Sequence, residues 1–384
     1  MRIAYVINNA AFFVSHRLPI GNGARAAGHQ VVVLTGQAGS VTMESAALQA
    51  LHACNMPHRA LAFGSSGVNP LRELIGLLQL TLALRRLRPD VVHCVSPKGI
   101  LYGGLASRLV GVRSLVLAVS GMGFLFTGRK RGPAKWLGSA YQRLVRLVYG
   151  HINKRVIVQN QDDWQALQST GLAQPDELVL IPGSGVCLAD YAVIDEQSRQ
   201  DLVVLPARML RDKGVSEFVA AARTLQAAGV GWRFALVGTA DYQNPTAVPQ
   251  EQIQRWVAQG DIEWWGHRED MPAVLAQARI VCLPSYREGM PKALLEAAAA
   301  GCAVVTTDVI GCREAVVPGV TGDLVPAMDA DALARCLLAL INDPPRLARY
   351  AQAGRLRAIE RFSEHAVVAQ TLGLYEELNH GAHD

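Results

Sequence analysis

The residues of this sequence best suited to chemistry are two glutamates, Glu288 and Glu296. The apolar run 279–283 before them predicts a β-strand, and residues 292–300 predict a helix. One carboxylate therefore lies on the loop after a strand, and the other lies on the helix that follows. In open α/β sheets ligands bind in this crevice, where the free N–H groups of a helix N-terminus attract anions such as a diphosphate.

Two cations follow an earlier strand in a comparable way. Arg208 and Lys213 come after the apolar run 202–205, and a helix is expected to begin near Val215. Arginine supplies a planar fork of donors and lysine a point charge, so the two can clamp a diphosphate. Taken alone, basic residues after a strand are more often solvent-facing than part of a binding site.

Residues 284–301 resemble the E-(x)7-E motif of family-4 retaining glycosyltransferases, and residues 208–215 resemble the R-(x)4-K-G-V diphosphate pattern of that family. The resemblance implies an α/β protein with the GT-B fold, in which two Rossmann-like parallel-sheet domains face a cleft. It implies that Arg208 and Lys213 hold the diphosphate, that Glu288 stabilises positive charge on the donor sugar, and that Glu296 accepts the ribose hydroxyls. The other donor-binding residues that it implies are Gly238, Gly266, Arg268, Gly289, Met290, Pro291 and Lys292.

The retaining outcome does not require a covalent enzyme intermediate. Double displacement would need a carboxylate nucleophile on the opposite sugar face, as in retaining glycosidases. The resemblance does not support that role for Glu288 and implies front-face attack, in which the departing phosphate takes the acceptor proton. No cofactor and no metal are expected, because the single D-x-D match, Asp329 with Asp331, precedes a helical run and is better interpreted as an N-cap.

The length of 384 residues allows two domains, and the charge is divided unevenly between them. Residues 1–161 hold 19 lysines and arginines against three acids, whereas the remainder holds 18 against 29. Residues 91–161 carry 11 basic residues and no acid, which indicates an anionic partner. No run of about 18 apolar residues occurs, and no signal peptide is recognised, so we expect a cytoplasmic protein. The seven scattered cysteines are expected to be reduced.

Apolar runs and helical patterns alternate along the chain, which predicts parallel sheets. We expect an acceptor-binding domain over 1–185, a nucleotide-sugar domain over 190–363 and a last helical segment over 364–384 that crosses back to the first domain. The expected strands are 2–7, 30–34, 91–95, 115–118, 155–159, 178–181, 202–205, 234–237, 262–265, 280–283, 303–306 and 322–325. The expected helices are 18–27, 71–87, 100–110, 133–151, 164–170, 214–228, 249–259, 271–278, 292–300, 331–342 and 364–378.

Candidates for the acceptor side follow strands of the first domain. His16 and Arg17 lie on an expected loop after the first strand, where similar transferases acting on polyprenyl-linked sugars carry a comparable pattern; for His16 a capping or packing role is equally open. Lys98 follows another strand and is placed to meet a phosphate. Many family members have a histidine after the strand matching 115–119, whereas this chain has Gly121 and Gly123, which are suited to present backbone N–H groups.

Aromatic, aliphatic and basic residues interleave in the segment 124–137, which includes Arg129, Lys130 and Arg131. Such a composition suits an anionic membrane surface. A merely solvated basic face is the alternative, and nucleic acid is a third option, although no recognised RNA- or DNA-binding motif is present. We therefore expect a peripheral position on the inner face of the cytoplasmic membrane and no nucleic-acid partner.

The expected function is transfer of a sugar, an N-acetylhexosamine such as GalNAc or GlcNAc, from a UDP-sugar to a polyprenyl-diphosphate-linked saccharide in surface polysaccharide (O-antigen or lipopolysaccharide) biosynthesis. The donor sugar and the UDP preference are implied by the resemblance alone. The rival enzyme is a GT-B epimerase of UDP-N-acetylglucosamine, and a second rival is a transferase with a soluble acceptor. The non-enzymatic rival is a membrane-binding module with a vestigial nucleotide site, which retention of both cations and both glutamates disfavours.

Overall fold

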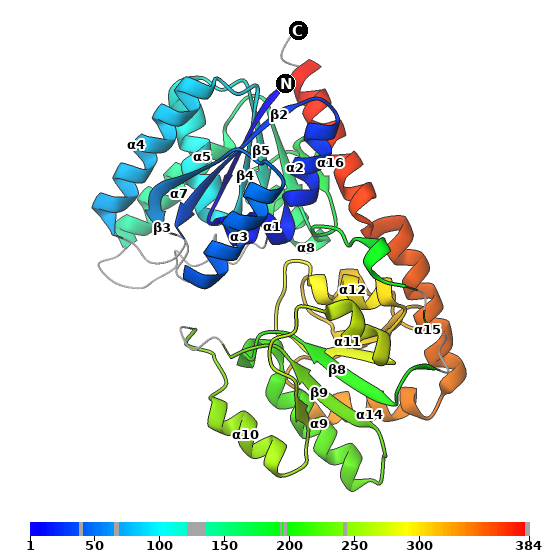
Figure 1. Cartoon of the computed structure of the whole chain (residues 1–384). Coiled ribbons are helices and arrows are strands. Elements are labelled where there is room, and N and C mark those ends of the chain that lie inside the picture. The colour runs from blue at the N-terminus through cyan, green and yellow to red at the C-terminus, as the bar shows by residue number, and fades with distance from the viewer. Residues whose placement is uncertain are drawn as a thin grey trace. The chain divides into compact units, whose positions relative to one another are not determined.

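The computed structural model of the chain describes residues 1–37, 41–64, 69–120, 135–192, 194, 198–240 and 244–380. The backbone divides into two compact units. Unit 1 comprises Met1–Ser184 and Val367–Asp384, and unit 2 comprises Gly185–Ala366. Each unit holds one sheet with helices on both of its faces (Figure 1).

The described strands of unit 1 form a seven-stranded sheet in the order β3-β2-β1-β4-β5-β6-β7, and all of its pairs are parallel. The strand order reverses between β1 and β4, so the carboxyl ends of these two strands form the switch point at which such sheets bind ligands. The strands are β1 (Arg2–Ile7), β2 (Gln30–Gln37), β3 (His58–Gly64), β4 (Val91–Val95), β5 (Ser114–Ala118), β6 (Lys154–Val158) and β7 (Leu178–Leu180).

Two layers of helices bury the faces of this sheet. One layer holds α1 (Ala10–His16), α2 (Leu18–Ala26), α3 (Val41–Ala53) and the last helix, α16 (Glu364–His380). The other layer holds α4 (Pro70–Leu87), α5 (Ser96–Val110), α7 (Lys135–Tyr149) and α8 (Gln161–Ser169). Because both faces are covered, β1 and β4 are buried almost throughout, which explains their continuous apolar sequences.

The described strands of unit 2 form a six-stranded parallel sheet in the order β10-β9-β8-β11-β12-β13. Here the order reverses between β8 and β11. The strands are β8 (Leu202–Pro206), β9 (Arg233–Val237), β10 (Glu263–Trp264), β11 (Ile280–Leu283), β12 (Ala303–Thr307) and β13 (Gly322–Val325). The α-helices are α9 (Val215–Ala227), α10 (Gln250–Ala258), α11 (Met271–Gln277), α12 (Lys292–Ala300), α13 (Cys312–Ala315), α14 (Ala330–Ile341) and α15 (Pro344–Arg357), and a π-helical turn, Ala358–Phe362, follows α15.

The alternation of strands and helices predicted from the sequence is confirmed, with a few elements missed. Residues 10–16 are not a loop but helix α1, which Asn9 begins by accepting a hydrogen bond from the N–H of Phe12 at 2.7 Å. The elements α3, β3, α13 and α15 were also not predicted. The N-cap interpretation of Asp329 is confirmed, since its carboxylate accepts from the N–H of Ala332 at 2.8 Å. In the part of the chain that the structure describes, no helix is both long and apolar enough to cross a bilayer.

Candidate functional site

The switch point of the unit 2 sheet brings two sequence-distant loops together. The loop after β8 contains Arg208 and Lys213, and the loop after β11 contains Glu288. The loops contact one another directly, because the N–H of Tyr286 donates to the carbonyl of Asp212 at 2.9 Å. Arg208 is exposed at the turn after β8, and Lys213 ends a short 3-10 turn just before α9.

Glycine at position 214 makes this approach possible. Gly214 has φ of +70°, in the left-handed region, and a Cβ atom there would overlap the carbonyl oxygen of Pro284 and lie 2.7 Å from the Pro284 Cγ. No other residue type avoids both the strain and the overlap. The sequence K-G-V therefore has a packing role in addition to any role in binding: it holds Lys213 against the β11 loop.

Lys213 and Glu288 form an ion pair across these loops. Ser285 also donates its Oγ–H to the same Glu288 Oε1 at 2.8 Å, and Thr307 on β12 donates to the Ser285 carbonyl. Both members of the pair are largely buried, with side-chain exposures of 20% for Lys213 and 13% for Glu288. Ser285 was not predicted as a site residue; its position three residues before Glu288 within the motif is the available signal.

This pair gives the site a specific electrostatic behaviour. Glu288 neutralises Lys213, so the site does not hold an uncompensated, partly buried cation. An anion that competed for Lys213 would free the Glu288 carboxylate to accept hydrogen bonds from hydroxyl groups. The arrangement therefore suits an anionic ligand that also carries hydroxyl groups.

The second glutamate, Glu296, lies on α12 and is also largely buried, with 16% of its side chain exposed. Its carboxylate lies 3.6 Å from Lys292 Nζ, one turn earlier on the helix, and it also pairs with the hydroxyl of Tyr191. Burial raises the pKa of Glu296, and the charge of Lys292 and the Tyr191 hydroxyl oppose this rise. Tyr191 is a site residue that sequence reasoning missed, since nothing local links it to Glu296, 105 residues further along.

Helix α12 begins directly at the proposed anion position. Pro291 is its N-cap and Lys292 its first residue, while Met290 packs against the unit 2 core. The backbone of the preceding segment is fixed, because the N–H of Glu288 donates to the Ile310 carbonyl at 3.0 Å. A Cβ at Gly311, which has φ of +83°, would lie 2.5 Å from the Glu288 carbonyl oxygen. Gly289 and the helix N-terminus are thereby held in place.

The remaining donor candidates lie after β9 and β10. Gly238 has φ of +145° and donates its N–H to the Gly266 carbonyl at 2.7 Å, so these two glycines form one backbone contact. The indole N–H of Trp264 donates to the Gly238 carbonyl at 2.9 Å, while the ring packs against the unit 2 core. Arg268 is paired with Asp270 at 2.6 Å and lies 6.0 Å from the ring centre of Trp265.

The acceptor candidates of unit 1 occupy three different environments. His16 stacks on Phe12 at 4.3 Å near the end of α1, which supports the packing alternative for this residue. Arg17 is buried between α1 and α2, and its guanidinium donates to the His16 carbonyl at 3.0 Å. Burial lowers the pKa of Arg17, against the opposing effect of the nearby Tyr5 and Tyr375 hydroxyls. Arg17 therefore lies within unit 1 and not on its surface.

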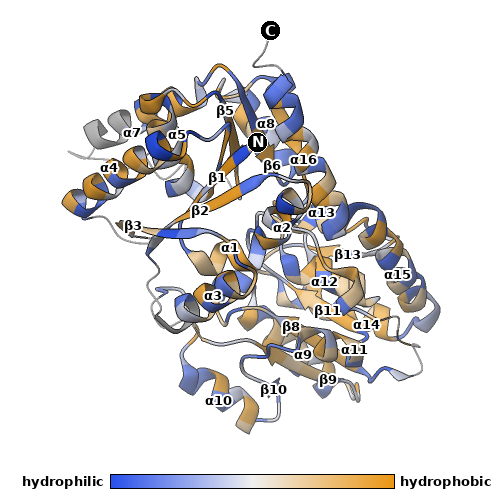
Figure 2. Ribbon diagram, turned by 45° about the horizontal axis from the view of Figure 1, so that its top comes forward, coloured by the Kyte–Doolittle hydropathy of each residue, from blue (hydrophilic) through white to orange (hydrophobic). Residues whose placement is uncertain are grey.

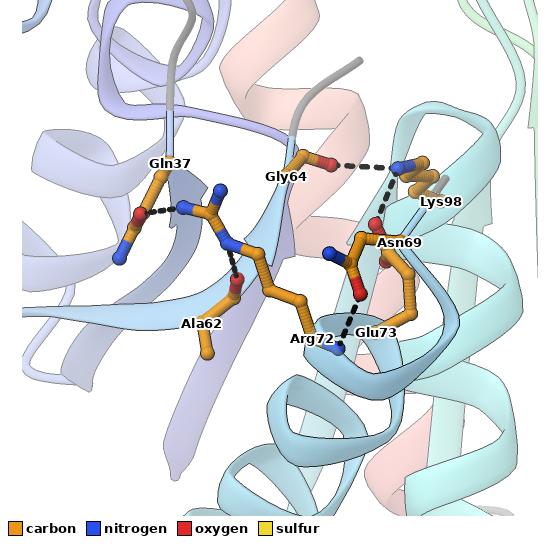
Figure 3. A network of polar contacts seen from close by, with 7 residues as sticks. All are labelled: Gln37, Ala62, Gly64, Asn69, Arg72, Glu73 and Lys98. Atoms are coloured by element: carbon orange, nitrogen blue, oxygen red, sulfur yellow. Dashed lines mark hydrogen bonds and ion pairs between the residues drawn. The ribbon is translucent and has the colours of Figure 1, made fainter. Parts of the chain in front are cut away.

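Lys98 lies in the first turn of α5, beside the carboxyl end of β3, and is already engaged within unit 1. Its Nζ lies 2.9 Å from Glu73 Oε1 and donates to the Gly64 carbonyl at 2.8 Å (Figure 3). The remaining predicted residues, Gly121, Gly123, Arg129, Lys130 and Arg131, lie outside the described residues. The site in unit 2 is thus the one whose geometry is most complete.

Two protein families match this chain. The Glycosyl transferase 4-like domain matches residues 17–183, within unit 1, and Glycosyl transferases group 1 matches residues 200–343, within unit 2. An N,N'-diacetylbacillosaminyl-diphospho-undecaprenol alpha-1,3-N-acetylgalactosaminyltransferase of Campylobacter jejuni is 24% identical over 393 residues, which cover 98% of this chain and 99% of that protein. A UDP-Gal:alpha-D-GlcNAc-diphosphoundecaprenol alpha-1,3-galactosyltransferase of Escherichia coli is 23% identical and covers 72% of each.

Solved structures resemble the whole chain in fold. Alr3699/HepE of Anabaena in complex with UDP has a TM-score of 0.76 at 18% identity, covering 98% of this chain and 100% of that one. Sucrose-phosphate synthase of Thermosynechococcus elongatus has a TM-score of 0.78 at 18% identity, covering 98% and 99%. These likenesses show the fold alone, and they confirm the expected fold class, GT-B with two Rossmann-like parallel-sheet domains.

Proposed function

Because this chain belongs to the group 1 glycosyltransferases, we propose that it moves a sugar, with retention, from a UDP-sugar to a polyprenyl-diphosphate-linked saccharide. The observation that carries the proposal is the ion pair of Lys213 and Glu288 at the switch point of unit 2, directly before the helix that presents Glu296. Cations, a hydroxyl-accepting carboxylate and a helix N-terminus within one short segment fit a nucleoside diphosphate sugar.

In this proposal each residue has a distinct task. Arg208 and Lys213 neutralise the diphosphate, helped by the backbone N–H groups at the start of α12. Glu296 accepts the two ribose hydroxyls, and Tyr191 and Lys292 hold its carboxylate in position. Gly238 and Gly266 border the nucleotide with backbone groups. A Cβ at Gly238 would overlap the Ala207 carbonyl oxygen, and Gly266 has φ of +65°, which other residues rarely adopt.

The reaction needs no nucleophile from the protein. The bond between the anomeric carbon and the phosphate oxygen breaks, and its electron pair leaves with UDP. The acceptor oxygen forms the new bond on the same sugar face, and its proton passes to the departing phosphate oxygen. Glu288 stabilises the positive charge that develops on the anomeric carbon, and Lys213 stabilises the negative charge that develops on the phosphate.

The acceptor is proposed to be a diphospho-polyprenol saccharide of a surface polysaccharide, such as an O-antigen precursor. Both relatives described above are named for diphospho-undecaprenol acceptors. The relative named for N-acetylgalactosamine transfer matches 98% of this chain and the one named for galactose transfer 72%, so an N-acetylhexosamine is our first choice of donor sugar. Such an acceptor places the enzyme on the cytoplasmic face of a membrane, and the cation-rich unit 1 is the part suited to that surface.

The decisive test measures nucleotide release from a panel of UDP- and GDP-sugars, with and without polyprenyl-diphosphate saccharides. Release that requires one UDP-sugar together with the lipid acceptor supports the proposal. Epimerised sugar without acceptor dependence would favour the epimerase, and release with water-soluble acceptors only would favour a soluble acceptor. Turnover with a GDP-sugar alone would overturn the UDP assignment.

A pair of variants separates a site role from a general effect. Glu288→Gln keeps the size of the side chain but removes the charge, and we expect turnover to fall about 100-fold or more while UDP still binds. Glu251→Gln, on the exposed face of α10, is the matched control and should retain full turnover. Equal activity of both variants would refute the role of Glu288.

A further inference from the structure

Helix α4 in unit 1 carries an apolar stripe on its solvent side. Its members recur at intervals of three and four residues, so they share one face of the helix. Their exposed fractions are those of surface residues, although all five are aliphatic: Leu71 68%, Leu74 54%, Ile75 42%, Leu78 56% and Leu82 54%. Single exposed leucines are ordinary, but a continuous row along three turns of one helix calls for an explanation.

The stripe cannot turn inward, because the opposite face of α4 is already packed. Leu80, Ala83 and Leu84 are buried in the core of unit 1. Gly76 contacts β3 so closely that a Cβ there would lie 2.6 Å from the Phe63 backbone nitrogen. Helix α4 is therefore apolar on two faces, as its mainly hydrophobic colour in Figure 2 indicates, and among the described residues only the face toward β3 is packed.

Polar contacts fix the beginning of α4 at the carboxyl edge of the sheet (Figure 3). Arg72 donates to the Ala62 carbonyl at 2.8 Å and also contacts Gln37, so it ties the helix to the ends of β3 and β2. Glu73 ties it to Lys98 at the start of α5. Since ligands of a parallel sheet bind at this edge, the stripe begins beside the expected acceptor position and runs away from it.

The surroundings of the stripe are cationic. The helices α4, α5 and α7 lie on the same face of the sheet, and their sequences contain one acid, Glu73, which is buried and paired with Lys98. Their exposed cations are Arg72, Arg85, Arg86, Arg108, Arg143 and Arg146. Helix α7 adds two half-exposed leucines, Leu144 at 40% and Leu147 at 46%, beside two of these arginines.

We propose that this surface docks on a lipid bilayer, with the α4 stripe (Leu71, Leu74, Ile75, Leu78 and Leu82) lying between the headgroups and acyl chains and the flanking arginines contacting anionic headgroups. Aliphatic residues on one face with cations at its borders are the composition of helices that lie in the membrane interface. A second copy of the chain is the less suitable occupant, because two such surfaces would bring like charges together. This docking surface rests on the proposed function in one respect: a lipid-linked acceptor would reach the carboxyl edge of the unit 1 sheet from the membrane on which α4 lies.

Vesicle flotation without any substrate tests the docking by itself. The protein is mixed with phosphatidylcholine vesicles with or without phosphatidylglycerol, and the bound fraction is measured. We expect binding that requires phosphatidylglycerol and falls at least about tenfold in the variant with Leu74, Leu78 and Leu82 changed to Gln. The matched control changes Val257, Leu356 and Ile359 of unit 2 to Gln in the same way. Their exposed fractions are 41%, 54% and 46%, and this variant should bind like the unchanged protein.

Two further readouts separate the possible failures. Turnover with a short-chain, water-soluble acceptor should be unchanged in the α4 variant, whereas turnover with the long-chain acceptor in vesicles should fall with the bound fraction. Absence of all turnover in the unchanged protein would count against the proposed function and leave the flotation result standing. Equal flotation of the α4 variant and the unchanged protein would overturn the docking surface, as would sedimentation showing a dimer that the α4 variant dissociates.

Discussion

Replacement of Gly214 by alanine should push apart the loops after β8 and β11, and with them Lys213 and Glu288. The size of this displacement follows from the structure. The new methyl group would overlap the Pro284 carbonyl oxygen and lie 2.7 Å from the Pro284 Cγ. Carbon atoms ordinarily approach to about 3.5–4.0 Å, so the loops after β8 and β11 must move apart by about 1 Å. Overpacking of this kind costs about 1–3 kcal/mol.

Gly229→Ala supplies the matched control within the same unit. Gly229 also has a positive φ, +84°, but a Cβ there meets nothing within 4 Å. Both alanine variants carry the left-handed strain of about 1–2 kcal/mol and the same reduction of unfolded-chain entropy. The difference between them therefore isolates the contact with Pro284, and we expect Gly214→Ala to be the less stable by about 1–3 kcal/mol.

Urea unfolding followed by tryptophan fluorescence measures this difference, because four of the six tryptophans lie in unit 2. The functional readout is donor turnover, which should fall about 100-fold in Gly214→Ala, since a displacement of about 1 Å misplaces Lys213 relative to Glu288. Gly229→Ala should keep its turnover. Equal stability and equal turnover of the two variants would refute the reasoning that Gly214 holds the β8 and β11 loops together.

Three further outcomes follow from individual residues. Because burial raises the pKa of Glu296, its carboxylate should become protonated at a higher pH than an exposed glutamate. The KM for the donor should therefore rise as the pH falls. Initial-rate kinetics should show that Glu296→Gln loses this pH dependence. Burial holds the pKa of His93 well below its usual value, so below about pH 6.5 the unfolded chain binds a proton that the folded chain does not. The free energy of unfolding should therefore fall with decreasing pH, by up to about 1.4 kcal/mol per pH unit. His93→Gln should reduce this slope, as urea titrations at several pH values would measure. Asp329→Ala should destabilise unit 2 by about 0.5–2 kcal/mol through loss of the α14 N-cap, measured by the same denaturation.

Most strands could be predicted from the sequence because strands buried on both faces are continuous apolar runs. The edge strand β3 was missed, since it begins with His58 and Arg59 and is partly exposed. Helix α15 was missed for a related reason: it is rich in charge, begins with Pro344 and Pro345, and owes its stability to a few contacts such as those of Leu347 and Tyr350.

The proposed docking surface is where sequence and structure differ most. In the sequence, the leucines of α4 are indistinguishable from core residues, because periodicity shows that they share a face but not what that face meets. Interleaved basic and aromatic residues indicated the segment 124–137 instead, of which residues 124–134 lie outside the described residues. The tertiary packing of Gly76 against β3, and of Leu80, Ala83 and Leu84 in the core, determines that the α4 stripe points outward.

The sequence by itself determined those features that depend on residues close together in the chain. These are the alternation of strands and helices, the positions of Glu288 and Glu296 on a loop and the following helix, and the placement of Arg208 and Lys213 after another strand. Tertiary structure alone decided that β8 and β11 are neighbours, which brings Lys213 to Glu288 across 75 residues, and that Tyr191 meets Glu296. The physical reason is that strand order and side-chain burial arise from packing of the whole unit, and the energies that select them are not local to any segment.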